Sequence, residues 1–434
     1  MIGKAIARRN WIKKTGLLAA ATTLSPAVPA MFRQMLQDKT VLLHSSWQTV
    51  NIGDIAHTPG LIKVLQDFSP DTQVILWPKS ELDRGAEAML RQGFPQLSII
   101  QGDLDDQLRP SSGALKEAFS KADFMLHGSG PSVVGQQGLK SWHESTGKAF
   151  GIYGVTIQDI SLELEDLLKK ASFVYTRETH SLKNLAAKGI QGEHTGFTPD
   201  ATFAMHLLDD QKASGFLQKN ELLEKQFICV IPRLRKTPYY KIHPDNAGWS
   251  QAYIEEVNAL NDEHKEKDHA KAREAMVTYV RETGNKVLVC PEMTYQLDIM
   301  EELLIEPLPA DVKENVVKRN TYWLPDEASS VYKKALAVLS FECHSPIMAF
   351  AHGTPAFYLR QPEDTIKGQM WYDIGVEDWV FEIEETKGED ISRQLMKVVE
   401  SYTSAQTYRQ KAMNYVSERH QNTMQFADQS FSKI

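Results

Sequence analysis

The chain has 434 residues, of which 42% are hydrophobic and 24% are charged, and its formal net charge is −8. This length is enough for two or three domains with buried cores, and the composition excludes a disordered or fibrous chain. No apolar run reaches the roughly 18 residues of a membrane-spanning helix, and the acidic balance gives no electrostatic reason to bind nucleic acid.

Residues 1–30 have the layout of an export signal. Arg8 and Arg9 begin a basic region, residues 16–27 are mildly apolar, and small residues that resemble a cleavage site follow. The paired arginines with Trp11 are similar to a twin-arginine signal, which exports folded proteins. We therefore expect the twin-arginine export machinery as a partner and a periplasmic or other extracytoplasmic location. If the leader is instead a basic amphipathic helix that stays attached, the protein is cytoplasmic.

Short apolar runs alternate with helical patterns through the first half of the mature chain. Parallel strands are buried on both faces, so they read as continuous apolar runs. A helix is expected to begin at Asp54 as its N-cap, and others are expected over residues 81–92, before Gly93, and 179–188, before Gly189. The strands expected in this half are residues 40–44, 73–77, 97–100, 123–126, 150–153 and 173–175.

A second series of the same kind follows a polar stretch that is rich in Asp, Lys and Glu. A long charged segment, residues 258–281, is expected to form a solvated helix. The strands expected here are residues 227–231, 287–289, 337–340 and 356–359. This alternation predicts two doubly wound, Rossmann-like α/β domains that face a cleft. The expected organisation is an export signal (1–30), an N-terminal domain (31–206), a linker (207–226), a C-terminal domain (227–390) and C-terminal helices (391–434).

Polar or glycine-rich loops follow several predicted strands, and ligands of open α/β sheets bind beyond the carboxyl ends of the strands. In the first domain, glycines permit close backbone approach, and exposed N–H groups suit an anionic or hydroxyl-rich ligand. Neither loop matches a phosphate-binding loop or a complete dinucleotide fingerprint, and each also has the pattern of an ordinary βα turn. The residues concerned are Asn51, Gly53, Asp54, Gly128, Ser129 and Gly130.

Three further loops place basic residues or a histidine after a strand. Arg177 ends the first series, and Arg233 and Arg235 open the second. Their guanidinium groups suit a carboxylate or phosphate, and salt bridges within the loops are the alternative. His344 is expected to begin a helix. It acts as an acid or base near neutral pH, or its alternative role is only to cap the helix. The neighbouring Cys343 is not expected to form a dyad with it, because adjacent side chains on a helix point apart.

These motifs follow one another in a recognisable order along the chain. They are Asn51-x-Gly53-Asp54, Gly128-Ser129-Gly130, Arg177-x-x-x-Ser181, Pro199-Asp200-Ala201-Thr202-Phe203, His344-Ser345, Gly353-Thr354-Pro355 and Lys367. Their order and spacing, over about residues 40–385, resemble those of the polysaccharide pyruvyl transferase family.

The resemblance implies a fold like that of two-domain glycosyltransferases of the GT-B type, with a saccharide acceptor in the first domain and phosphoenolpyruvate in the second. Family members transfer the enolpyruvyl unit of this donor to two sugar hydroxyls as a ketal and release phosphate. The reaction needs cations for the donor, an acid for its methylene carbon and a base for the hydroxyls. By resemblance, the candidate catalytic residues are His344 and Asp54, the donor-binding residues are Arg177, Arg233, Arg235 and Lys367, and the acceptor side is shaped by Asp54 and residues 128–130.

One position departs from the family pattern. Glu342 occupies the place, two residues before the histidine, where the family commonly has arginine. A carboxylate there, about 4 Å from the donor carboxylate, repels it by at least about 1 kcal/mol. Replacing Glu342 by arginine restores the commoner pattern and, if the donor site is otherwise intact, is expected to improve phosphoenolpyruvate binding.

Export would also separate the protein from phosphoenolpyruvate, which is a cytoplasmic metabolite. Two alternatives therefore stand beside the transferase. One is a GT-B-like glycosyltransferase with another donor. The other is an exported saccharide-binding protein of the same fold without transferase activity.

The sequence suggests neither a metal nor a cofactor. The 13 histidines are scattered without ligand spacing, and the 3 cysteines are too few for a thiolate site or a disulfide framework. If the loops converge as the topology predicts, Asp54, Gly130, Arg177, Arg233 and His344 line one groove between the two domains.

Overall fold

The computed structural model describes residues 39–243 and 248–431. Contacts divide the chain into residues 1–39 and a compact unit of residues 40–434. The expected export signal lies outside the described residues. None of the described helices is both long enough and apolar enough to cross a lipid bilayer.

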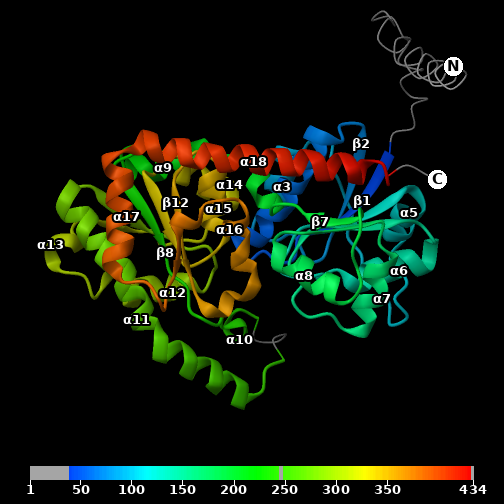
Figure 1. The fold of residues 1–434 in the computed structure, drawn as a ribbon, viewed down its shortest axis with the longest axis horizontal. Coiled ribbons are helices and arrows are strands. Elements are labelled where there is room, and N and C mark those ends of the chain that lie inside the picture. Colours follow the sequence, from blue (N-terminus) through cyan, green and yellow to red (C-terminus); the bar gives the residue numbers. More distant parts are fainter. Residues whose placement is uncertain (1–38, 244–247, 432–434) are drawn as a thin grey trace, which may run out of the picture. The chain divides into compact units, whose positions relative to one another are not determined.

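Two parallel sheets form the framework of residues 40–434 (Figure 1). The first consists of β1 (Lys39–Ser45), β2 (Thr72–Pro78), β3 (Ser98–Ile99), β4 (Phe124–His127), β5 (Phe150–Val155), β6 (Phe173–Thr176) and β7 (Thr195–Phe197). The second consists of β8 (Phe227–Ile231), β9 (Lys286–Val289), β10 (Val316–Lys318), β11 (Ala337–Ser340), β12 (Ala356–Arg360) and β13 (Val380–Glu382). The strand orders are β3-β2-β1-β4-β5-β6-β7 and β10-β9-β8-β11-β12-β13, which confirms the predicted doubly wound α/β fold.

The sequence analysis missed β7, β10 and β13. Each has three residues, lies at the edge of its sheet and is partly exposed. Such short edge strands lack the continuous apolar run by which a buried parallel strand is recognised.

Helices connect the strands in both halves. The first half contains α3 (Ile52–Phe68), α4 (Ala86–Gly93), α5 (Gly113–Lys121), α6 (Gln136–Thr146), α7 (Leu162–Lys170), α8 (Thr179–Ala187), the 3₁₀ turn η1 (Ala201–Ala204) and α9 (Asp210–Lys219). The second half contains α10 (Tyr239–Ile242), α11 (Gln251–Thr283), α12 (Gln296–Met300), the π-helical η2 (Glu301–Ile305), α13 (Ala310–Lys313), α14 (Pro325–Lys334), α15 (His344–Ala351), η3 (Pro362–Gly368), α16 (Gln369–Asp373), η4 (Glu377–Trp379), α17 (Gly388–Glu400) and α18 (Tyr402–Asp428).

The first sheet is buried on both faces. Val41 and Leu43 of β1 pack in one core with α3 and α4, whereas Leu42 packs in another core with α5, α6 and α7. Successive side chains of a strand point to opposite faces, so the uninterrupted apolar run of β1 fills both cores.

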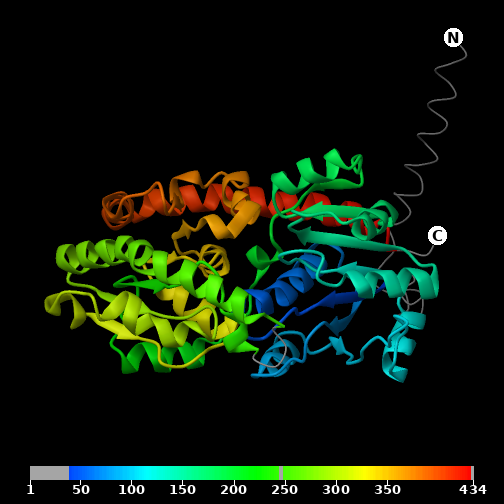
Figure 2. The ribbon, with the colours of Figure 1, turned by 90° about the horizontal axis from the view of Figure 1, so that it is seen from below.

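The long helix α18 joins the two halves. Ala412 and Val416 belong to the core of the second sheet, and Met424 and Ala427 belong to that of the first. Figures 1 and 2 both show this helix running past elements of the two sheets. Because apolar residues of α18 are buried in the cores of both sheets, this helix links the two halves.

Two helices of the first half begin differently from the prediction. The N-cap of α3 is Asn51, not Asp54: the Asn51 Oδ1 accepts a hydrogen bond from the Gly53 N–H at 2.7 Å. Asp54 lies in the first turn instead, where a carboxylate is favoured by the helix dipole. The helix expected over residues 81–92 is shorter, because α4 begins only after Gly85, whose φ is +91°.

Two polar segments are also more structured than expected. The charged segment forms α11, but this helix is not solvated all round, because Ala272, Met276 and Tyr279 are fully buried. These residues are three and four positions apart, which gives a mostly charged helix a buried stripe. The polar stretch 207–226 contains a helix, α9.

Candidate functional site

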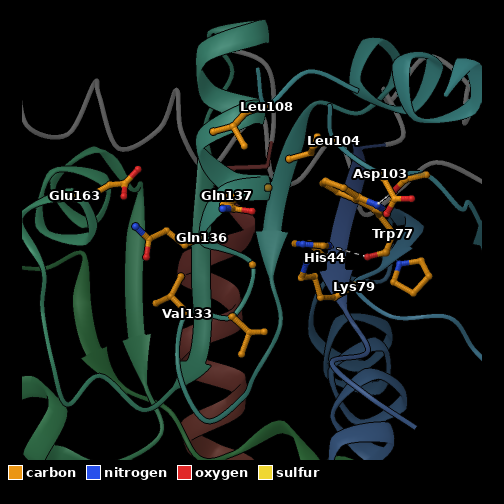
Figure 3. A pocket seen from close by; sticks show the side chains of 15 residues that line it. His44, Trp77, Lys79, Asp103, Leu104, Leu108, Val133, Gln136, Gln137 and Glu163 are labelled. Atoms are coloured by element: carbon orange, nitrogen blue, oxygen red, sulfur yellow. Dashed lines mark hydrogen bonds between the residues drawn. The ribbon is translucent and has the colours of Figure 1, made fainter. Parts of the chain in front are cut away.

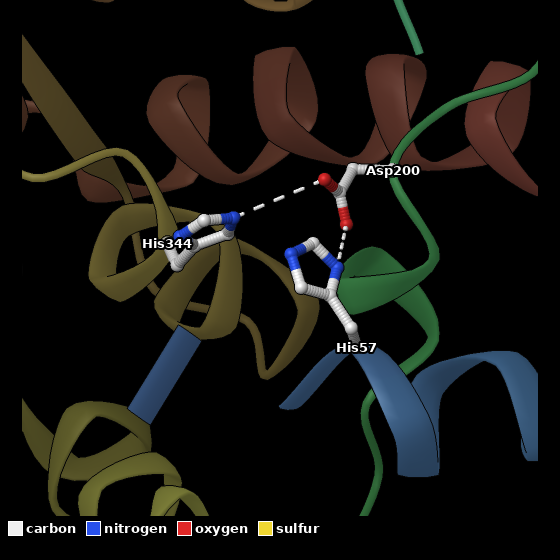
Figure 4. Close-up of side chains that lie close together, drawn as sticks. All are labelled: His57, Asp200 and His344. Atoms are coloured by element: carbon white, nitrogen blue, oxygen red, sulfur yellow. Dashed lines mark ion pairs between the residues drawn. The ribbon is translucent and has the colours of Figure 1, made fainter. Parts of the chain in front are cut away.

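Two places at the carboxyl ends of strands are candidates for a functional site. One is a pocket of the first sheet (Figure 3), and the other is a buried side-chain cluster where the two sheets meet (Figure 4). The meeting is fixed by backbone hydrogen bonds between the loops after β1 and β9: the Ile52 N–H donates to the Glu292 carbonyl at 3.1 Å, and the Thr294 N–H donates to the Val50 carbonyl at 3.0 Å. This pairing holds the start of α3 against the second sheet.

The cluster is centred on the carboxylate of Asp200. Its Oδ1 lies 3.1 Å from the Nδ1 of His57, and its Oδ2 lies 3.9 Å from the Nε2 of His344 (Figure 4). The Arg177 Nη1 donates to the Asp200 Oδ2 at 2.7 Å. The two imidazole rings meet edge to face with their centroids 4.8 Å apart. All four side chains are buried, so their charges interact in a poorly solvated environment.

The small residues of α3 make this approach possible. A Cβ at Gly53 would overlap the ring of His344, and a Cβ at Gly60 would overlap the carbonyl of Ala201, in η1. Gly53, His57 and Gly60 are four and three positions apart and therefore share one face of the helix. His57 was missed by the sequence analysis, although this spacing of small residues around a histidine marks a face that packs closely against something.

Asp200 is held as an anion. Burial opposes its ionisation, but His57 and the Arg177 guanidinium hold the pKa of Asp200 well below its usual range. The Thr202 N–H also donates to the Asp200 Oδ1 at 2.9 Å. A carboxylate that accepts these hydrogen bonds is stabilised in its charged form.

His57 is held as a neutral imidazole. Burial lowers the pKa of His57 below its usual value, against the opposing effect of Asp200. Its Nδ1 lies 2.7 Å from the Ser129 Oγ as well as beside Asp200. Because a carboxylate only accepts hydrogen bonds, the proton lies on Nδ1 and the Nε2 carries a lone pair. That Nε2 is buried and has no hydrogen-bond partner among the described residues.

His344 is held in the opposite state. Burial opposes its charge, but Cys343 and Glu292 raise the pKa of His344 well above its usual value. The Glu292 Oε1 lies 3.4 Å from the His344 Nδ1. A buried carboxylate this close favours the imidazolium.

Cys343 lies next to His344 in space, contrary to the expectation that the two side chains point apart. The Cys343 Sγ is 3.5 Å from the His344 Nδ1. The reason is that Cys343 is the N-cap of α15 and precedes its first turn. The rule for neighbours inside a helix therefore does not apply to this pair.

A second group of charged side chains lies in the second half. The Arg233 Nη1 donates to the Asp364 Oδ1, and the Lys367 Nζ lies 2.9 Å from the same oxygen. The Arg233 Nε lies 3.4 Å from the Glu342 Oε2, and the Gln296 Nε2 donates to the Glu342 Oε1 at 2.8 Å. Two cations, a carboxylate and a titratable carboxyl thus share one buried site.

Glu342 therefore faces a cation rather than an empty donor site. Burial raises the pKa of Glu342 to about 7, even though Arg233 acts in the opposite direction. An arginine at position 342 would lie against Arg233 and repel it. The expected gain in donor binding from Glu342→Arg stays a prediction, and the structure adds that the present carboxyl lies 3.4 Å from the Arg233 Nε.

The structure brings some of the sequence-predicted residues together. Gly53, Ser129, Arg177 and His344 meet at the cluster around Asp200. Arg233 and Lys367 meet in the second group.

Other predicted residues lie elsewhere. Arg235 points toward Asp268 and Glu384, at 2.9 and 2.7 Å, and so does not join Arg233. Asp54 accepts a hydrogen bond from the Gln48 Nε2 at 2.5 Å. The N–H groups of the glycine loop are used within the first sheet, where Gly128 donates to the His44 carbonyl and Gly130 to the Gly154 carbonyl.

The cluster also has the composition of a metal site. His57, Asp200 and His344 each offer one ligand atom, and these atoms lie within 4.8 Å of one another. The three residues are far apart along the chain, so no ligand spacing in the sequence indicates this grouping. However, the Arg177 guanidinium already neutralises Asp200, and a metal ion would be repelled by it. The arrangement fits proton transfer better than metal binding.

A sequence profile described as polysaccharide pyruvyl transferase matches residues 51–361. The chain belongs to this family. The matched residues include the cluster around Asp200 and, of the second group, Arg233 and Glu342 but not Asp364 or Lys367. A search of curated proteins found no match to the sequence.

Solved structures of similar fold come from several bacteria. The structure of Anabaena HepE in complex with UDP has a TM-score of 0.53 and 11% identity and covers 90% of this chain and 98% of that one. S. aureus MnaA in a structure with UDP has a TM-score of 0.53 and 12% identity and covers 90% and 96%. A glycosyltransferase from Rickettsia africae has a TM-score of 0.54 and 11% identity and covers 90% and 96%. At these identities the likeness shows the fold alone, which is of the GT-B type.

Family membership and fold together place the chain among saccharide-modifying transferases. In a GT-B-like fold the two sheets present their strand ends to each other, and ligands bind there. The cluster around Asp200 lies at such strand ends: Arg177 follows β6, and His344 follows β11.

Proposed function

We propose that the chain transfers a pyruvyl unit from phosphoenolpyruvate to two hydroxyls of a saccharide. The observation that carries this proposal is the pair of histidines beside Asp200, one held neutral and the other held protonated. Neighbouring titratable groups with opposite proton states are the usual mark of an acid and a base. A family that forms ketals from an enol phosphate needs both.

In this proposal His344 is the acid and His57 is the base. His344 gives its proton to the methylene carbon of the donor, which becomes a methyl group and leaves C2 electrophilic. A saccharide hydroxyl forms a bond to C2 while its proton passes to the His57 Nε2. The bond between C2 and the phosphate oxygen then breaks, and phosphate leaves with the electron pair. The second hydroxyl attacks C2 in the same way; one hydroxyl proton restores His344, and the other leaves with phosphate.

Asp200 and Arg177 position these groups in the proposal. Asp200 fixes the His57 tautomer by accepting from Nδ1, which leaves Nε2 available as the base. Arg177 keeps Asp200 ionised through its 2.7 Å contact. Arg177 is thereby a positioning residue rather than the donor clamp that the sequence suggested.

The donor anion is assigned to Arg233 and Lys367. Arg233 is buried, the Lys367 side chain is 20% exposed, and both share Asp364 as their partner. When Glu342 is protonated, the pair carries the surplus positive charge that a carboxylate or phosphate needs.

The proposal is tested by phosphate release from phosphoenolpyruvate in the presence of saccharides. We expect His344→Ala and His57→Gln each to lower turnover by about 10²–10⁴-fold, the usual contribution of acid–base catalysis. His206→Gln is the matched control, because His206 packs against Phe94, outside the cluster.

Calorimetry with phosphoenolpyruvate separates the transferase from a binding protein. A wild-type chain that binds no phosphoenolpyruvate and releases no phosphate with any saccharide would contradict the proposal. That result would favour an exported saccharide-binding protein, for which the carboxyl of Glu342 in place of arginine is the motivating observation.

A further inference from the structure

The first sheet contains a pocket that the proposed reaction does not use. It has a volume of about 480 Å³ and lies beyond the carboxyl ends of β1 and β2, beside the start of α6 (Figure 3). In the order β3-β2-β1-β4, β1 is the strand from which the chain winds in two directions, and a crevice opens at this point of such sheets. The residues that line its inner part include His44, Trp77, Gly135 and Gly138.

The floor of the pocket is a stacked pair of rings. His44 lies on Trp77 with the ring centroids 4.1 Å apart, and the His44 Nδ1 donates to the Trp77 carbonyl at 2.9 Å. A carbonyl only accepts, so the proton lies on Nδ1 and the other ring nitrogen, Nε2, carries a lone pair. Figure 3 shows that second nitrogen pointing away from Trp77, into the middle of the pocket. His44 itself is buried, its exposed fraction being 2%.

Two glycines of the neighbouring segment make room for the His44 ring. A Cβ at Gly135 or at Gly138 would overlap the His44 ring or press against it. Burial lowers the pKa of His44 to about 4, so the ring stays neutral near pH 7. Beside it, Gly135 is the N-cap residue of α6 and provides no side-chain cap, which leaves N–H donors of the first turn directed out of the helix.

The rim of the pocket is polar and carries charges of both signs. It carries a single lysine, two carboxylates and two amides, which are Lys79, Asp103, Glu163, Gln136 and Gln137. Such mixed donors and acceptors suit hydroxyl groups, whereas a nucleoside diphosphate or an enol phosphate requires a cluster of cations. A ring surface flanked by amides and carboxylates is the lining expected for a neutral polar ring.

The pocket is separated from the cluster around Asp200 by a second ring pair. Trp47 stacks on His127 with the centroids 4.7 Å apart, and the Trp47 Nε1 donates to the Ser129 carbonyl. On the pocket side, the Gly135 N–H donates to the His127 Nε2 at 2.9 Å. On the other side, the Ser129 Oγ lies against His57. A ligand in the pocket therefore does not touch the proposed acid and base.

We propose that this pocket is a saccharide subsite, which holds a sugar ring of the acceptor other than the one that is modified. The inference rests on the proposed function only in that the acceptor is a saccharide. The His44 Nε2 accepts from one sugar hydroxyl, and Gln136 and Gln137 contact others at the rim. An acceptor of several sugar units thus gains affinity from a ring that undergoes no chemistry.

Saturation-transfer NMR tests the subsite without the donor. The probes are the methyl glycosides of glucose, galactose, mannose and N-acetylglucosamine, each added to the wild-type chain. The variant Gln137→Trp places an indole in the pocket from an exposed position, so the core is unchanged. Gln211→Trp is the matched control, because Gln211 is also an exposed second residue of a helix, α9.

We expect at least one glycoside to bind the wild type and the control alike, and to bind Gln137→Trp at least about tenfold more weakly, since the indole fills the pocket. Equal binding by Gln137→Trp, or no binding of any probe by the wild type, would overturn the inference. A chain that binds a glycoside in this pocket but releases no phosphate would overturn only the proposed function. If the chain releases phosphate but Gln137→Trp leaves glycoside binding unchanged, only the subsite is overturned.

Discussion

Replacement of Glu342 by glutamine is expected to change how the stability of the protein depends on pH. Burial raises the pKa of this carboxyl from 4.5 to about 7 in the folded chain. A carboxyl whose pKa is raised by folding binds its proton more tightly in the folded state than in the unfolded one. Its contribution to stability is therefore fully present below the unfolded pKa and is lost as the pH rises through about 7.

The size of the effect follows from the two pKa values. Between about pH 5.5 and about pH 8.5, such a shift removes about 2 kcal/mol from the free energy of unfolding. The variant Glu342→Gln keeps the size and the amide contact of the side chain but cannot titrate. Relative to this variant, the wild type should therefore lose about 2 kcal/mol of stability across that interval.

Urea unfolding at the two pH values, followed by tryptophan fluorescence, measures this difference. Other titrating groups are common to both proteins and cancel in the comparison. Glu389→Gln, a change of an exposed carboxylate in the first turn of α17, should show the same pH dependence as the wild type. If the free energies of the wild type and of Glu342→Gln run parallel across the interval, Glu342 ionises as it does in water and the reasoning is refuted.

Three further predictions concern the packing and the leader. Gly53→Ala should destabilise the fold by about 1–3 kcal/mol, because its Cβ would overlap His344; unchanged urea unfolding would count against the close approach. Arg177→Ala should cost about 3–5 kcal/mol, since it leaves Asp200 buried without its cation, and Arg177→Ala combined with Asp200→Asn should recover part of that loss; a double variant no more stable than the single one would argue against the pair. We propose that residues 1–30 direct export, so that Arg8→Lys with Arg9→Lys should retain the full-length chain in the cytoplasm. Fractionation that finds the wild type there at full length would exclude this.

Sequence alone determined the fold class of this protein and the loops in which to look for a site. The strands of the two parallel sheets are continuous apolar runs, such as Val41 to Leu43, because both faces of each sheet are covered. The motifs from Asn51 to Lys367 follow strand ends in a fixed order, and that order was sufficient to indicate the family. These features depend on local periodicity and on residue types, which a sequence contains in full.

The tertiary structure decided which charges meet. Arg233 and Arg235 are two residues apart and look alike in the sequence, but one lies on Asp364 beside Glu342 and the other lies on Asp268. The carboxylate that pairs with each arginine is determined by how helices that are distant in the sequence pack beside it. A local sequence pattern contains no information about that packing.

The same holds for the cluster around Asp200. His57 was overlooked and Cys343 was set aside, and both lie within contact of the cluster only because α3, η1 and the start of α15 are pressed together. The proton states of His57 and His344 then follow from burial and from the neighbours each ring has. Burial and neighbours are properties of the packed chain, so only the structure distinguishes the two rings by the direction in which their pKa values shift.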